Sequence, residues 1–79
     1  SGIILYPNPA NQTVNISVTQ ASGNANVSIF DINGRLILTK EISLDTTTSL
    51  DVSQVTSGVY LVQVTAQEGF IKTTKLIIQ

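Results

Sequence analysis

Apolar and polar side chains alternate with a period of two along most of this chain, and this pattern limits its possible folds more than any other feature. The alternation is strict in Val14-Asn15-Ile16-Ser17-Val18, where every second side chain would point to the same side of an extended strand. The β-branched residues Val, Ile and Thr supply 28 of the 79 residues, and they favour strands over helices. No window shows the sustained apolar spacing of an amphipathic helix. The sequence therefore predicts an all-β fold.

Short apolar runs separated by turn residues predict about seven strands. The runs cover approximately residues 3–6, 13–19, 25–32, 35–43, 48–52, 58–66 and 70–78. Asn33-Gly34 predicts a hairpin with a type I′ turn, in which both central residues need positive φ. Strands this short and closely spaced favour an immunoglobulin-like antiparallel β-sandwich. The residues expected between its two sheets are Ile16, Val27, Ile29, Leu38, Val62 and Val64.

Gly58 and Tyr60 open the predicted sixth strand. In immunoglobulin-like sandwiches, a tyrosine at this position often returns its hydroxyl to the backbone a few residues upstream, forming a tyrosine corner. Gly58 would then allow a tight turn ahead of the tyrosine. The alternative is that Tyr60 is a core aromatic residue whose hydroxyl reaches water.

The composition argues against several classes of function. The chain has no cysteine and no histidine, which removes thiolate chemistry, the commonest metal ligand and the usual general base near neutral pH. Four basic and five acidic side chains give a net charge of −1, unlike the basic surface of a nucleic-acid binder. No apolar run approaches the roughly 20 residues of a membrane span. We therefore expect no enzymatic activity, no metal or other cofactor, no small-molecule substrate and no nucleic-acid partner.

Four motifs follow one another along the chain: Tyr6-Pro7-Asn8-Pro9-Ala10-Asn11, Val27-Ser28-Ile29-Phe30-Asp31 with Asn33-Gly34-Arg35, Ser57-Gly58-Val59-Tyr60, and Lys75-Leu76-Ile77-Ile78. In this order and spacing they resemble the type A C-terminal sorting domain of the type IX secretion system of Bacteroidetes. The resemblance covers nearly the whole chain. It implies a single sorting domain at residues 3–79, and we interpret Ser1-Gly2 as the end of a linker or a cloning remnant.

The resemblance also implies a route and a set of partners. A cargo protein carries such a domain at its C-terminus and is exported through the periplasm to the cell surface or the medium. The expected partners are the outer-membrane type IX translocon, its shuttle protein, a sortase-like peptidase and the covalently linked N-terminal cargo. The cargo is then released or attached to surface lipopolysaccharide.

Nine residues are candidates for recognition by the translocon: Pro7, Asn8, Pro9, Gly58, Tyr60, Lys75, Leu76, Ile77 and Ile78. Each has a structural alternative. Pro7-Asn8-Pro9 can be a rigid bend that ends a strand at the sheet edge, and Gly58 and Tyr60 can serve the fold alone. Lys75, with Lys72, can guard an edge strand against unwanted pairing. The final apolar run, from Leu76 to Ile78, exceeds what an edge strand with one wet face needs, which favours a covering segment or a partner.

A second function remains open at this stage. The chain can be an accessory sandwich of a secreted hydrolase, either a spacer or a carbohydrate-binding module. Sugar-binding faces usually need aromatic platforms, and this chain has no Trp and only Tyr6, Phe30, Tyr60 and Phe70. The strand-like run that reaches Gln79 reflects either a tightly trimmed fragment or a terminus that is itself used.

Overall fold

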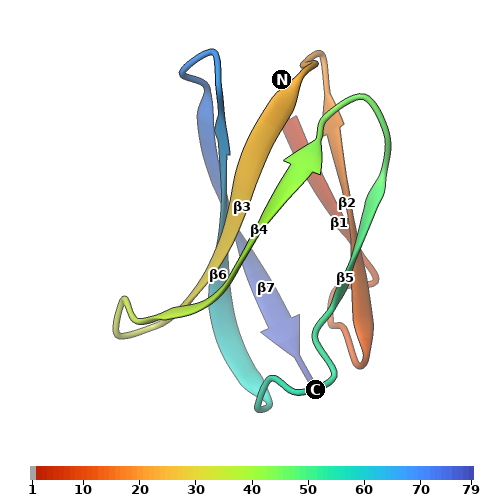
Figure 1. Cartoon of the computed structure of the whole chain (residues 1–79). Helices are drawn as coiled ribbons and strands as arrows, with labels where there is room; N and C mark the ends of the chain where they lie inside the picture. Colours follow the sequence, from red (N-terminus) through yellow and green to blue (C-terminus); the bar gives the residue numbers. More distant parts are fainter. Residues whose placement is uncertain (1) are drawn as a thin grey trace.

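The computed structural model describes residues 2–79, which form two antiparallel β-sheets packed face to face (Figure 1). The smaller sheet has the strand order β1-β2-β5 and the larger sheet the order β4-β3-β6-β7. The strands are β1 (Gly2–Tyr6), β2 (Thr13–Thr19), β3 (Asn24–Asp31), β4 (Leu36–Ser43), β5 (Thr48–Asp51), β6 (Gly58–Ala66) and β7 (Ile71–Ile78). Each predicted strand is found within one residue of its expected bounds. The predicted seven-stranded sandwich is confirmed.

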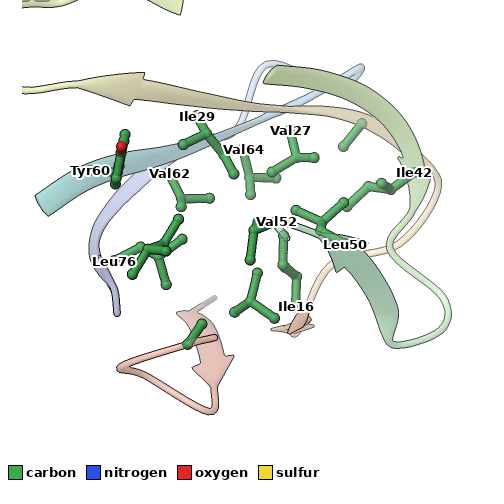
Figure 2. Packing of buried hydrophobic residues seen from close by; sticks show 14 of the residues in the cluster. Ile16, Val27, Ile29, Ile42, Leu50, Val52, Tyr60, Val62, Val64 and Leu76 are labelled. Atoms are coloured by element: carbon green, nitrogen blue, oxygen red, sulfur yellow. The ribbon is translucent and has the colours of Figure 1, made fainter. Parts of the chain in front are cut away.

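The core lies between the sheets and is built from alternate residues of the strands (Figure 2). Of the six residues expected there, five are fully buried: Ile16, Val27, Ile29, Val62 and Val64. Leu38 is only half-buried, so its prediction is corrected. It belongs to β4, an edge strand of a sheet with one strand more than the sheet it faces, and the register shifts beside its partner Ile29. Period two predicts a side chain's face but not how well that face is covered.

The hairpin between β3 and β4 has a different turn from the one predicted. Gly34 has a φ of 84°, but Asn33 does not have positive φ, so the type I′ prediction is wrong. The Gly34 N–H donates to the Asp31 carbonyl (3.0 Å) and the Asp31 N–H donates to the Arg35 carbonyl (2.9 Å). The loop is therefore a three-residue turn that needs a left-handed residue only at its last position. The Asp31 carboxylate stabilises it by accepting the N–H groups of Asn33 and Arg35, each at 2.9 Å.

The hairpin between β6 and β7 repeats this geometry. Gly69 has a φ of 98°, its N–H donates to the Ala66 carbonyl (2.9 Å), and the Ala66 N–H donates to the Phe70 carbonyl (2.8 Å). Both hairpins of the larger sheet thus place glycine third in a three-residue loop. This hairpin sets the register of β7 against β6, on which the candidate site depends.

Gly2 is the first residue of β1 and pairs with Thr19. Ser1 lies outside the described residues, and the division into a linker at residues 1–2 and one domain at residues 3–79 stays a prediction. None of the described residues belongs to a helix long and apolar enough to cross a membrane.

Candidate functional site

The nine candidate residues gather at one end of the sandwich, where β7 finishes. On one side of β7, Gly58 pairs with Ile78 and Tyr60 with Leu76. On the other side, the chain leaves β1 and passes along the edge of β7 through the segment 7–10, as Figure 1 shows near the C-terminus. Residues nearly seventy positions apart in sequence are therefore in direct contact.

The segment that follows β1 holds β7 through four hydrogen bonds. The Asn8 side chain donates from Nδ2 to the Lys75 carbonyl and accepts the Ile77 N–H at Oδ1, both at 3.0 Å. Ala10 continues the pairing in parallel: its N–H donates to the Ile77 carbonyl and its carbonyl accepts the Gln79 N–H, both at 2.8 Å. We call this arrangement, formed by Asn8 and Ala10, the clasp. The peptide bonds that precede Pro7 and Pro9 are both cis.

The clasp covers only the last part of the β7 edge. The Ala66 N–H bonds to the Phe70 carbonyl, and alternation along an antiparallel ladder then turns the even-numbered residues of β7 towards β6. The odd-numbered residues direct their N–H and carbonyl groups outwards. The clasp satisfies those between Lys75 and Gln79, whereas among the described residues it does not extend to Thr73. The predicted bend at the sheet edge is present, and it covers one half of an edge strand.

The side chains of β7 divide between two faces. Leu76 and Ile78 are buried in the core, whereas Lys75 is exposed and Ile77 half-buried on the opposite face. The last apolar run was expected to need a covering segment. The clasp covers its backbone edge, and the core encloses the side chains of Leu76 and Ile78. These two side chains are therefore not available to a partner while the domain is folded.

Lys72 and Lys75 have different environments although they lie on the same strand. Lys72 pairs with the buried Val64, and Lys40 on the opposite edge strand β4 pairs with the buried Val27. Residues directly opposite in a pair share a face, so both lysines extend from the core-facing side of an edge strand. Inward-directed charges of this kind prevent edge-to-edge association. Lys75 points to the outer face of the sheet, so it is not an inward-directed charge of this kind.

Tyr60 forms the predicted corner. Its hydroxyl donates to the Thr56 carbonyl, four residues upstream, while its ring is almost fully buried. Gly58 does not have the role expected of it, because its φ is not left-handed. A Cβ at this position would lie 3.6 Å from Cε2 of Tyr60, an ordinary contact. Gly58 thus leaves room over the tyrosine ring and does not make the turn itself.

The carboxylates near this end stabilise loops. The pKa of Asp31 is held below its ordinary value by the backbone N–H groups of Arg35 and Asn33 and by the charge of Arg35, whose Nε lies 3.2 Å from the carboxylate. The Ser53 hydroxyl and N–H similarly lower the pKa of Asp51. Both carboxylates are already engaged by neighbouring groups, which suits a structural role in turns.

A shallow polar hollow of about 550 Å³ lies beside the last residue. Its lining is Pro7, Asn11, Gln12, Thr13 and Gln79. None of these side chains is ionisable, so the hollow offers hydrogen-bonding groups without an acid, a base or a nucleophile.

Comparison with known proteins gives two matches. A family model described as "Secretion system C-terminal sorting domain" matches residues 4–79. The whole chain is also similar, at 32% identity over 79 residues, to part of an endo-acting ulvan lyase from Formosa agariphila, of which it spans 15%. The chain belongs to the family of secretion system C-terminal sorting domains. It is a sorting signal of type IX secretion, which directs a protein to the cell surface or the extracellular space, and such a signal is not itself catalytic.

Sequence reasoning found the segments of this end but not their contacts. Pro7-Asn8-Pro9 predicted a bend, and nothing in the sequence identified the Asn8 side chain as the group that binds β7. It also missed the outward-facing apolar residues of β3 and β6. The uninterrupted run Val59-Tyr60-Leu61-Val62 was a usable signal, because a strand with one wet face does not need apolar residues in both phases.

Proposed function

We propose that the type IX translocon and its shuttle protein recognise the folded carboxyl end of this sandwich, meaning the last residues of β7 together with the clasp. A sortase-like peptidase then separates the domain from its cargo, which precedes it in the chain. Neither nucleic acid nor a small-molecule substrate takes part, and no cofactor is needed. The domain contributes the shape of its carboxyl end.

The observation that carries this proposal is the convergence of the candidate residues on one end. The clasp holds Lys75 and Ile77 from one side while Gly58 and Tyr60 support Ile78 and Leu76 from the other. The last residue is also fixed, because the Gln79 N–H donates to the Ala10 carbonyl. An ordered terminus presents one conformation to a receptor, so less conformational entropy is lost on binding than with a frayed end.

The test uses a reporter fused ahead of this chain in a host with type IX secretion. Appending a few polar residues after Gln79 leaves the core intact but adds chain directly beyond the end of β7. We expect the extended fusion to remain folded by circular dichroism and to accumulate in the periplasm. The control inserts the same residues into the exposed loop at Thr46 and Thr47, where export should continue.

Deletion of residues 76–79 is a less informative experiment. It removes Leu76 and Ile78 from the core, and truncating such aliphatic side chains costs about 2–5 kcal/mol each in a domain of small total stability. Loss of export would then reflect unfolding. Normal export of the extended fusion would instead contradict recognition of the terminus and direct attention to the body of the sandwich.

A further inference from the structure

The outer face of the larger sheet is divided into an apolar half and a polar half. Residues that alternate with buried ones point away from the smaller sheet, and near the end of β7 five of them are apolar. Phe30 pairs with both Leu36 and Leu61, and Val59 pairs with Ile77, so these side chains are adjacent across all four strands. We call these five residues the outer patch.

The outer patch is open to solvent. Leu36 is 51% exposed, Val59 44% and Leu61 43%. The next row on the same face is polar, with Thr39, Ser28, Gln63 and Thr73 paired in order across the sheet. Single exposed apolar residues are common, whereas a contiguous group beside a polar surface marks an interaction site.

One charge lies within this apolar half. Lys75 pairs with Leu61, so its side chain emerges on the outer face, and its carbonyl is fixed by Asn8. Arg35 is nearby but is paired with Asp31 at 3.2 Å. Among the described residues, no carboxylate forms an ion pair with Lys75. The outer patch therefore combines apolar area with one cation, Lys75, that forms no ion pair among the described residues.

We propose that the outer patch binds a protein surface that presents aliphatic or aromatic side chains around one carboxylate, and that this carboxylate pairs with Lys75. The inference rests on the proposed function, because the partner belongs to the export machinery. It adds a docking face to the recognised terminus. The two are continuous, since Lys75 and Ile77 are held by the clasp and also belong to this half of the face.

Two other occupants fit less well. Attraction to an anionic membrane takes a cluster of about four to eight basic residues, and here one lysine is available. A second copy of the chain would bring another outer patch with its own Lys75, and the described carboxylate on that face, Glu41, lies two rows away in the polar half. A different protein can match both the apolar area of the outer patch and the charge of Lys75.

The first experiment compares exported reporter fusions. Val59→Thr combined with Leu61→Thr places a β-branched, strand-favouring residue at both positions while removing apolar area. We expect surface delivery to fall by about tenfold or more, the effect of losing central apolar contacts of an interface. Ile71→Thr is the matched control, since Ile71 is 58% exposed on the same face but in the polar half, and it should leave delivery unchanged.

The second experiment identifies the partner and remains informative if the double variant unfolds. A photo-crosslinking amino acid at position 61 should join the domain to a protein of the export machinery, whereas the same group at Gln63, one row away, should not. Lys75→Glu should reduce delivery, and replacing the crosslinked partner's carboxylate with lysine should restore it. Lys72→Glu is the charge-matched control and should not respond to the partner's lysine.

The outcomes separate this inference from the proposed function. Retention of the unaltered fusion in the periplasm would contradict both. Normal delivery of the unaltered fusion and of the Val59→Thr, Leu61→Thr variant would contradict the outer patch alone. Crosslinks at position 61 that join two copies of the chain would show that a second copy is the occupant instead. Loss of the crosslink to the partner when anionic vesicles are added would show that a membrane is the occupant.

Discussion

Asn8 does with its side chain what a strand residue does with its backbone. A carboxamide presents an N–H donor and a carbonyl acceptor in one plane, as a peptide group does, so it pairs with both the Lys75 carbonyl and the Ile77 N–H. Aspartate lacks the donor, and serine is too short to span both groups. The motif therefore needs an amide at this position for a geometric reason.

Removing this amide should loosen the end of β7. We expect Asn8→Ala to lower the free energy of unfolding by about 1–2 kcal/mol, since two hydrogen bonds are lost and water replaces them in part. Asn11→Ala is the control, because Asn11 is exposed and its side chain forms no hydrogen bond among the described residues. Urea midpoints measure the difference, and faster hydrogen exchange at the Ile77 amide locates it. Equal midpoints for the two variants would show that the clasp contributes nothing to stability.

Tyr60 gives a second test at the same scale. Tyr60→Phe keeps the buried ring and removes only the hydroxyl that binds the Thr56 carbonyl. We expect a loss of about 1 kcal/mol, the usual net contribution of one hydrogen bond. Chemical denaturation at neutral pH measures it, and an unchanged urea midpoint would mean that the corner does not stabilise the fold.

The edge strands are the elements most exposed to unwanted pairing with another chain. Lys40 on β4 and Lys72 on β7 both extend from core-facing positions of the larger sheet, and the edge near Thr73 has no clasp residue over it among the described residues. Replacing both lysines with valine should therefore produce concentration-dependent association, visible by sedimentation. Lys75→Gln is the comparison variant, and it should remain monomeric because Lys75 lies on the other face. If the double-valine variant stays monomeric, Lys40 and Lys72 do not protect the sheet edges.

The loops that follow β3 and β5 respond to acid in a definite direction. The folded domain holds the pKa values of Asp31 and Asp51 below the ordinary 3.8, so near that pH the unfolded chain binds more protons than the folded one. The stability that these carboxylates contribute is present above pH 3.8 and declines as pH falls through their folded pKa values. We expect urea midpoints to fall in that range, and to fall less for Asp31→Asn combined with Asp51→Asn. An identical decline in the variant would assign the acid sensitivity to other groups.

At this scale the sequence predicted much of what was found and failed for physical reasons. Strand bounds follow from turn residues and period two, which are local properties. The turn type at Asn33 depends on how the Asp31 carboxylate captures the loop, and the burial of Leu38 depends on which strand lies at an edge. Both are decided by tertiary arrangement. The face on which Lys75 lies was also not predictable from the sequence. In Leu76-Ile77-Ile78 both phases are apolar, so alternation alone does not identify the inner face.

The whole molecule separates its two ends. Its extents are 31 × 22 × 17 Å, with the start of β1 at one end and Gln79 at the other (Figure 1). A protein attached ahead of β1 would therefore lie far from the clasp and the outer patch. Under the proposed function, recognition would take place at the end opposite to the attachment point of the cargo, which would allow one kind of signal to serve cargo domains of different size and shape.

The parallel pairing of Ala10 with β7 also has a mechanical consequence. If the carboxyl end is pulled one way while a load drags on β1, the segment 8–10 and β7 slide past each other along their length. The four hydrogen bonds of the clasp lie across that direction, so they bear the tension together instead of opening one after another. A domain built this way resists being unravelled when it is pulled from its carboxyl end.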